Sequence, residues 1–477
     1  MAIRQWTQNF FVPTIIYESR YYISEVGQRR AIRRASDTAE RSSGRKTKNG
    51  RFMCYIIMKR PIDIIKLIKL LPLDFMSQTA EDLKADYKVK KLQALRLFSI
   101  LLIAFIRQSE ISQRKVCEQI SSFWLDEFLN ITMGSCTVTH SSLSERLASI
   151  NPDYFARVYQ KILSITEKHI GLDQLFDSGI IRVDTTLVAE TSAKLSDGIN
   201  TGVNNRFGGQ KRQLKYGMAY DGFAAVLAKV FDQQQASSEE VALGKTILET
   251  ASDIAREGDD LVFDRGVAGY DTLCGLKELC RKKHCHFISR LKLRRIYHPC
   301  QDNMIAGVTV KDDEFEIIED CIATLNRPAN SEYGVEKFRI IKVRFIKTRP
   351  KTLPSAKRRR YEPEMLLITD DFDSDPLTLV HKYKKRWDIE VFYKFLKQNL
   401  SFSHFLTTNR NGIQVVLYMT LITAVLIKLY AALNDIGPTI AQTRMVIQLE
   451  NWIYTHPLVH HHRNTPKPKN SPDKHKT

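Results

Sequence analysis

The sequence predicts an α/β protein in which a helical N-terminal region precedes an α/β layer, a β-rich stretch and C-terminal helices. Helical periodicity dominates from residue 61 to about residue 177. Two apolar runs, Gly179–Asp184 and Leu261–Asp264, each end on an aspartate, and hairpin and helix signals lie between them. Strand-like runs replace helical ones between residues 285 and 370. This order of strand, hairpin, helix, strand and helix is typical of an α/β layer.

Length and charge restrict the class of protein. A chain of 477 residues can form two or three domains, and its 43% hydrophobic content is that of a globular protein. The formal net charge of +19 indicates a polyanionic partner, either nucleic acid or an anionic membrane surface. The membrane alternative is weak, because the apolar segment 97–106 is too short to span a bilayer and Lys428 interrupts the segment 412–433.

Two features indicate a cytoplasmic location. Arginines at positions 29, 30, 33 and 34 stand where a signal peptide would need an apolar run. The eight cysteines lack a disulfide-like spacing, which fits a reducing cytosol. We therefore expect a cytoplasmic protein that binds nucleic acid.

The N-terminal part is predicted to contain a basic, disordered extension at residues 1–57 and a helical DNA-binding domain at residues 58–177. Apolar residues at helical spacing indicate helices at Ile64–Leu71, Leu92–Ile106, Ile111–Phe123 and Ser141–Ile150. Thr139 would cap the last of these and place short polar side chains in its first turn, as recognition helices do. An ordinary N-cap explains the same residues and is the preferred interpretation.

The first part of the α/β core is predicted at residues 178–284. Two β-like runs, Leu214–Tyr220 and Ala224–Phe231, meet at Asp221-Gly222, which is a strong hairpin signal. Ser237 and Glu240 form a capping box for a helix that continues to about Arg256. A second helix is expected over Tyr270–Lys283.

A β-rich insertion is predicted at residues 285–370, the second part of the core at 371–435, and a helical segment with a basic, disordered tail at 436–477. The expected strands of the insertion are Cys285–Leu291, Val308–Ile318, Phe338–Lys347 and Met365–Thr369. In the third of these, Ile341 and Val343 face one way and Lys342 and Arg344 the other, which is the pattern of a half-buried strand. Residues 412–433 are expected to form a buried helix.

The stretch from Tyr383 to Lys397 carries the most informative pattern. On an α-helix at about 100° per residue, its residues divide between two faces. The polar stripe holds Tyr383, Arg386, Glu390, Lys394 and Lys397. The opposite, apolar side holds Ile389, Phe392 and Leu396. One carboxylate among three cations is suited to a metal ion beside a polyanion, although an ordinary amphipathic helix has the same pattern.

Three carboxylates are candidate metal ligands. Asp184 and Asp264 each end an apolar strand, and Glu390 lies on the polar stripe. If the two strands are neighbours, their ends converge and the helix can place Glu390 across them. Two Mg²⁺ ions about 4 Å apart, held by carboxylates, can activate a water or 3′-hydroxyl and stabilise the leaving oxygen in phosphodiester chemistry.

The spacing Tyr383-x₂-Arg386-x₃-Glu390-x₆-Lys397 resembles the signature of DDE transposases of the insertion-sequence four (IS-four) family. Segments 183–186 and 262–266 resemble the family's two other acidic blocks. The resemblance covers about residues 179–433 and implies an RNase H-like catalytic core with a large β-rich insertion, preceded by an all-helical DNA-binding domain. It implies catalytic and metal-binding roles, with two Mg²⁺ ions that Mn²⁺ can replace, for Asp184, Asp264 and Glu390. It implies DNA contacts by Tyr383, Arg386 and Lys397, with Lys394 and Arg265 as weaker additions.

The same resemblance implies a bacterial transposase that acts as a homodimer on double-stranded DNA and is nucleoid-associated when bound. Such an enzyme binds the terminal inverted repeats of an insertion sequence, cleaves the ends and joins the 3′-hydroxyls to target DNA. The alternatives are an RNase H-like nuclease or resolvase without strand transfer, and a catalytically inactive DNA-binding relative. The sequence has no GxxxxGK[ST] motif, so no nucleotide cofactor is expected.

Two further patterns bear on this interpretation of the sequence. Some family members cut DNA through a DNA hairpin intermediate, in which a flipped nucleotide stacks on a tryptophan of the inserted β region. All four tryptophans of this chain lie outside that region. Tyr297 or Tyr333 could offer a stacking face, so the hairpin route of cleavage stays open. The cysteines and histidines between residues 274 and 300 suggest zinc, but they lack a paired C-x₂-C.

Overall fold

The computed structural model describes residues 62–107, 112–120, 138–170, 179–187, 199–204, 210–232, 235–236, 238–267, 269–300, 310–346, 364–400, 402 and 406–455. All of them belong to one compact unit, Arg60–Thr477. The predicted extension at residues 1–57 and the predicted tail beyond residue 455 lie outside the described residues.

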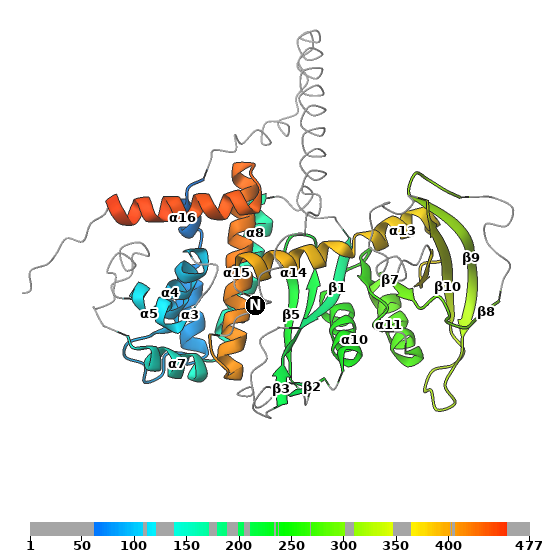
Figure 1. The fold of residues 1–477 in the computed structure, drawn as a ribbon, viewed down its shortest axis with the longest axis horizontal. Coiled ribbons are helices and arrows are strands. Elements are labelled where there is room, and N and C mark those ends of the chain that lie inside the picture. The colour runs from blue at the N-terminus through cyan, green and yellow to red at the C-terminus, as the bar shows by residue number, and fades with distance from the viewer. Residues whose placement is uncertain are drawn as a thin grey trace, which may run out of the picture. The chain divides into compact units, whose positions relative to one another are not determined.

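Helices from both ends of the described chain pack into one helical region (Figure 1). They are α2 (Ile64–Ile68), α3 (Leu73–Asp82), α4 (Ala94–Arg107), α5 (Gln113–Ile120), α7 (His140–Ser149), α8 (Asp153–Ile170), α15 (Arg410–Asn434) and α16 (Pro438–Thr455). The long helix α15 contacts α4, α7, α8 and α16, because its apolar residues surround its axis rather than forming one stripe. The predicted buried helix at residues 412–433 is thereby confirmed. By length and composition α15 could also cross a membrane, yet 83% of its apolar window is buried inside the protein.

The capped helix predicted from Thr139 is present as α7. Thr139 is the N-cap, and its side-chain oxygen accepts a hydrogen bond from the backbone N–H of Ser142 at 3.2 Å. The predicted helix Leu92–Ile106 begins two residues later, at Ala94. The reason is a local cap: the Asp86 carboxylate accepts from the N–H of Ala94 at 2.7 Å.

A nine-stranded mixed sheet forms the second layer of the unit, in the order β5-β4-β1-β6-β7-β11-β10-β9-β8. The strands are β1 (Ile180–Leu187), β4 (Lys215–Tyr220), β5 (Ala225–Phe231), β6 (Asp260–Phe263), β7 (His286–Leu291), β8 (Tyr297–Pro299), β9 (Phe315–Leu325), β10 (Lys337–Phe345) and β11 (Glu364–Thr369). Only β1, β6 and β7 pair in parallel, and the other pairs are antiparallel. A separate two-stranded sheet joins β2 (Ile199–Asn204) and β3 (Gln210–Gln213).

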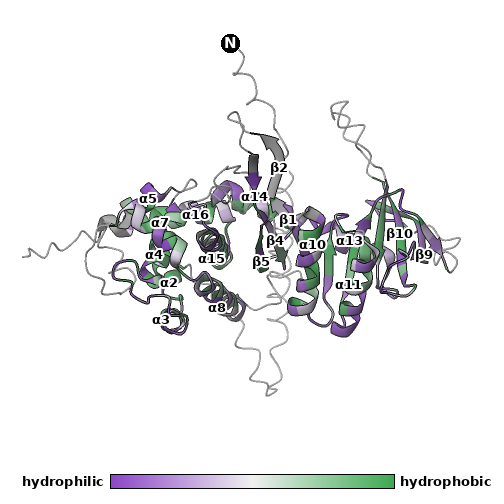
Figure 2. Cartoon of the chain, turned by 90° about the horizontal axis from the view of Figure 1, so that it is seen from below, coloured by the Kyte–Doolittle hydropathy of each residue, from purple (hydrophilic) through white to green (hydrophobic). Residues whose placement is uncertain are grey.

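Helices cover both faces of the sheet. One face lies against α10 (Glu239–Glu249), the π-helical turn η1 (Thr250–Ile254) and α11 (Tyr270–Lys283). The other face lies against α13 (Pro376–Lys384) and α14 (Trp387–Asn399). Figure 2 shows hydrophobic residues where these helices meet the strands. Strands β4 and β5 confirm the predicted hairpin, and the bounds of α11 are those predicted.

Two further predicted elements differ from the structure in their bounds. The helix expected from the Ser237 capping box is capped by Ser238 instead, and its helical turns end at Ile254 rather than near Arg256. The predicted strand Val308–Ile318 is confirmed only from Phe315, because the Asp312 carboxylate accepts from the two following N–H groups of Glu314 and Phe315 and turns the chain before that residue; residues 308–309 lie outside the described residues. Strand β9 therefore starts only after this turn.

The single helix predicted over Tyr383–Lys397 is also wrong, because α13 ends at Lys384 and α14 begins at Trp387 (Figure 1). The N–H of Arg386 donates to the carbonyl of Tyr383 at 2.9 Å, and this i→i+3 bond tightens the turn between the helices. The buried side of α14 agrees with the prediction: Ile389, Phe392 and Leu396 are all buried.

Candidate active site

Two aspartates lie side by side because β1 and β6 are parallel neighbours. The last paired residues of these strands are Val183 and Phe263, so Asp184 and Asp264 occupy the next position along each strand. Val183 and Phe263 point into the core beneath α10 and α11. Because strand side chains alternate, both aspartates point to the opposite face, which α13 and α14 cover. The predicted neighbouring strands are confirmed, but β1 continues past Asp184 to Leu187, so this aspartate lies within its strand.

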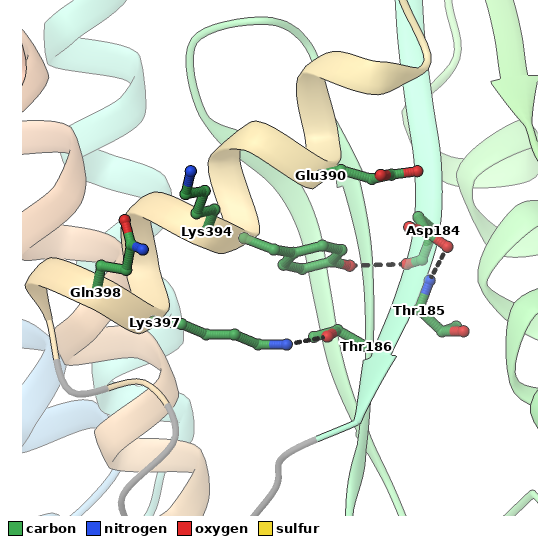
Figure 3. Close-up of a pocket in the computed structure, with 8 residues that line it drawn as sticks. Asp184, Thr185, Thr186, Glu390, Lys394, Lys397 and Gln398 are labelled. Atoms are coloured by element: carbon green, nitrogen blue, oxygen red, sulfur yellow. Dashed lines mark hydrogen bonds between the residues drawn. The ribbon is translucent and has the colours of Figure 1, made fainter. Parts of the chain in front are cut away.

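Helix α14 lies directly on β1 at this point. The hydroxyl of Tyr393 donates to the backbone carbonyl of Asp184 at 2.9 Å, and the Lys397 ammonium donates to the Thr186 hydroxyl at 2.6 Å. Asp184 and Glu390 line one open cavity of about 410 Å³ between the helix and the strand. Figure 3 shows the Glu390 carboxylate on the side of α14 that faces Asp184.

The turn between α13 and α14 is fastened to β1 by Arg182. This guanidinium is fully buried and donates to the Lys385 carbonyl at 3.3 Å and to the Asp388 carboxylate at 3.1 Å. A third bond reaches the carbonyl of Ile180 at 2.7 Å. Arg182 therefore fixes α14, and with it Glu390, relative to the strand that carries Asp184. The sequence contains one signal for this role, which is a cation in the middle of an apolar strand.

The carboxylates influence one another electrostatically. Burial, together with the negative charges of Glu390 and Asp264, raises the pKa of Asp184 to about 6, although the Thr185 N–H and Arg386 oppose the rise. Three acidic groups therefore share one region of low polarity. The prediction that these residues meet in space is consistent with this coupling.

Arg386 and Tyr383 each contact one of the other two acids, Glu390 and Asp264. The Arg386 guanidinium donates to Glu390 Oε1 at 2.7 Å, and the Tyr383 hydroxyl lies 3.5 Å from Asp264 Oδ1. Tyr383 is 8% exposed, so its ring belongs to the core and only its hydroxyl reaches the site. Burial, and then the charge of Asp264, raises the pKa of Tyr383.

The remaining predicted residues lie at different depths. Lys397 is half-buried, and burial lowers the pKa of its ammonium although Asp184 opposes this. Lys394 is exposed at the rim of the cavity, and Figure 3 shows its side chain directed away from β1. Arg265 is exposed, and its backbone N–H donates to the Asp264 carboxylate at 2.7 Å.

Arg290 is a further site residue that sequence reasoning missed. Phe263 of β6 pairs with Ser289 of β7, so Arg290 follows on β7 where Asp264 follows on β6. Its positive charge lowers the pKa of Tyr383, which places it near the acids. Only the pairing of β6 with β7 reveals that Arg290 lies near Asp264, because helix α11 separates the two residues in the sequence.

The residues present fit an oxygen-loving cation such as Mg²⁺. Asp184, Asp264 and Glu390 offer carboxylate oxygens, and burial, with smaller contributions from the other two acids, disfavours the ionised form of Asp184, which a bound cation would stabilise. Within the described parts of the chain, no three acidic, histidine or cysteine side chains are arranged to hold an ion together. The hydrogen bond from Arg386 accounts for part of this, because it turns Glu390 Oε1 toward a cation of the protein.

Comparisons with known proteins agree on one family. Residues 174–426 match the family model described as the transposase DDE domain. Over 246 residues the chain is 23% identical to a protein of Sinorhizobium fredii named putative transposase y4zB, covering 51% of this chain and 60% of that protein. A Synechocystis protein named putative transposase for insertion sequence element IS4SA is 33% identical over 66 residues, which are 14% of this chain and 20% of that protein. The matches thus span less than two thirds of either relative.

Proposed function

Because this chain belongs to the family of transposase DDE domains, whose model matches residues 174–426, we propose that it is the transposase of an insertion sequence. In this proposal it binds terminal inverted repeats, cleaves the ends of the element and joins the 3′-hydroxyls to target DNA. Family membership implies an enzyme of DNA transposition that binds DNA and uses a divalent metal.

One observation carries the proposed chemistry: Asp184 and Asp264 lie next to each other on parallel strands, on the face where α14 places Glu390. We assign these three carboxylates as ligands of two Mg²⁺ ions, with Mn²⁺ as a substitute. When bound, the ions would lower the pKa of the attacking water or 3′-hydroxyl and stabilise the leaving oxygen.

The chain's own residues prepare the site. Glu390 accepts from Arg386 and must release it to offer both oxygens to a cation. The freed guanidinium can then bind a phosphate, which it can do with two parallel hydrogen bonds. Lys397, held at the base of the cavity by Thr186, and Lys394, at its rim, would bind flanking phosphates. The Tyr383 hydroxyl would orient Asp264 from below.

The fold supports this assignment. Strand order β5-β4-β1-β6-β7, antiparallel on one side of β1 and parallel on the other, is what an RNase H-like core requires. In this proposal β7, which lies within the insertion predicted at residues 285–370, belongs to the core, and β8 to β11 extend the same sheet as the insertion. The helical region would supply DNA binding before the core. We further propose a homodimer on DNA, located in the bacterial cytoplasm and nucleoid-associated when bound.

The test is metal-dependent cutting and joining of DNA that carries the element's ends. Asp184→Ala, Asp264→Ala and Glu390→Ala should each abolish cutting and keep DNA binding. Asp373→Ala, which removes an exposed carboxylate in the turn before α13, should cut like the wild type. Unchanged cutting by any of the three variants would remove that residue from the site.

Strand transfer separates the proposal from its alternatives. Pre-cleaved ends joined to a target plasmid would support a transposase. Ends that are cut but never joined would support an RNase H-like nuclease or resolvase. Binding without cutting in either metal would indicate an inactive relative.

A further inference from the structure

A second cavity, of about 550 Å³, lies outside the candidate active site and is lined by arginines. Arg294 and Arg295 come from the loop between β7 and β8, and Arg327 comes from the turn after β9. The opposite wall is the first turn of α11, at Gly269 and Tyr270. Three segments that are distant in the sequence thus place three cations around one hollow.

Two of the segments that line the cavity follow the strand ends at the sheet edge that carries the candidate active site. Strands β1, β6 and β7 are parallel, so their C-terminal ends share one edge. The chain passes from Asp264 at the end of β6 to Gly269, and from Leu291 at the end of β7 to Arg294. Neighbouring strands lie about 4.8 Å apart, which puts the end of β7 roughly 10 Å from β1. A DNA strand rises about 3.4 Å per nucleotide along its axis, so the step from β1 to the end of β7 corresponds to about three nucleotides, and the cavity lies beyond that end.

The positive charge of this cavity is poorly compensated among the described residues. The Nε of Arg295 is buried there without a hydrogen-bond partner, and no ion pair joins Arg294 or Arg295 to an acid in the part of the chain that the structure describes. The guanidinium of Arg327 donates to two carbonyls, of Tyr333 at 2.6 Å and Ser331 at 2.8 Å. These bonds orient the guanidinium but do not neutralise its positive charge. Burying this one N–H group without an acceptor, the Nε of Arg295, costs free energy, and an anion bound in the cavity would supply the acceptor.

The first turn of α11 also favours an anion in this cavity. Its N-cap is Gly269, which has no side chain to accept from the first N–H groups of the helix. The positive end of the helix dipole therefore also favours an anion here. The Asp271 carboxylate in this turn already accepts from the Ser331 hydroxyl, and the Tyr270 hydroxyl already donates to the Gly334 carbonyl at 2.5 Å.

We propose that this arginine cavity binds a backbone phosphate of the DNA strand that passes over the candidate active site. The inference rests on the proposed function, in which a DNA strand passes over this edge of the sheet. Guanidinium groups suit phosphate oxygens through charge-assisted, paired hydrogen bonds. The cavity would therefore fix the position of the strand a few nucleotides from the scissile bond and carry no information about sequence.

The test compares the salt dependence of DNA binding between charge-matched variants of the full chain. The probe is a random-sequence DNA duplex in the presence of a metal chelator, so that cutting does not interfere. Arg294→Ala/Arg295→Ala should lower the slope of log affinity against log salt by about 1, the value for one phosphate contact. Arg281→Ala/Lys283→Ala removes the same charge from the exposed far end of α11 and should leave the slope unchanged. Arg294→Lys/Arg295→Lys should keep most of the slope, because it keeps the charge.

Three outcomes would overturn the inference. Equal slopes for the cavity variant and the charge-matched control would show that no phosphate is bound there. A mononucleotide that raises the melting temperature of the wild type but not of the cavity variant, with the DNA slope unchanged, would assign the cavity to a free nucleotide. A wild type whose DNA affinity does not depend on salt would refute the proposed function itself, which the other two outcomes leave intact.

Discussion

Replacing Asp184 by asparagine should stabilise the protein while it abolishes activity. The pKa of Asp184 in the folded protein is about 6, against 3.8 for an ordinary aspartate. The folded state therefore binds this proton more tightly than the unfolded state. As pH rises from 3.8 to 6 the native protein must give up the proton in an unfavourable setting, so stability falls over this window and stays reduced above it.

The magnitude follows from the same two values. They differ by about 2, and each pKa unit corresponds to about 1.36 kcal/mol, so the ionised carboxylate destabilises the fold by about 3 kcal/mol at pH 8. An asparagine side chain at this position would carry no charge, and its oxygen can still accept the hydrogen bond that Thr185 donates to Asp184 at 2.8 Å. Asp184→Asn should therefore gain up to about 3 kcal/mol at pH 8 and nothing near pH 3.8.

Urea denaturation between pH 4 and pH 8, in the presence of a chelator, measures this difference. Asp373→Asn, at an exposed carboxylate, serves as the control and should follow the wild type at every pH. Adding Mg²⁺ should narrow the gap, because a ligand of the folded state stabilises the wild type by mass action and would find one carboxylate missing in the variant. The reasoning would be refuted by a variant that is no more stable than the wild type at pH 8, or by a gap that does not change with pH.

Four other substitutions test buried contacts and close packing in the fold. Arg182→Met should lower the free energy of unfolding, measured by urea denaturation, by about 2–4 kcal/mol, because it leaves the Asp388 carboxylate without its buried partner. The variant should also slow DNA cutting more than it weakens DNA binding. Equal effects on cutting and binding would show that Arg182 has no positioning role. Burial lowers the pKa of Lys428 from 10.5 to about 7, so this lysine should reduce the stability of the wild type by up to about 5 kcal/mol as pH falls from 10.5 to 7. Lys428→Met should not show this loss of stability, and an equal loss in the variant would contradict the lowered pKa. Gly217→Ala should destabilise the protein by about 1–3 kcal/mol, because the new methyl group would lie 2.1 Å from the Thr246 hydroxyl oxygen. Gly244→Ala, with no atom nearer than 3.8 Å, should instead gain up to about 1 kcal/mol of helix stability, and thermal melts that rank the two glycine variants the other way would disprove the close approach.

Local patterns in the sequence were sufficient for most secondary structure. The bounds of α11, the hairpin at Asp221-Gly222 and the buried side of α14 all follow from residues close together in the chain. Such features depend on backbone propensity, turn chemistry and side-chain periodicity, which neighbouring residues decide. The same local signals failed at Asp312, where a side chain turned the backbone within an apolar run.

The sequence by itself identified the acidic residues and their cationic neighbours, because the types and spacing of residues are written in the chain. Only the tertiary structure decided that β1 and β6 are neighbours, and that Arg182 binds Asp388 of α14, which lies 206 residues away in the sequence. The pKa of Asp184 and the charge of the arginine cavity also arise from groups that folding brings together and removes from water. Burial and electrostatic coupling are properties of distances in space, and the order of residues along a chain does not contain those distances.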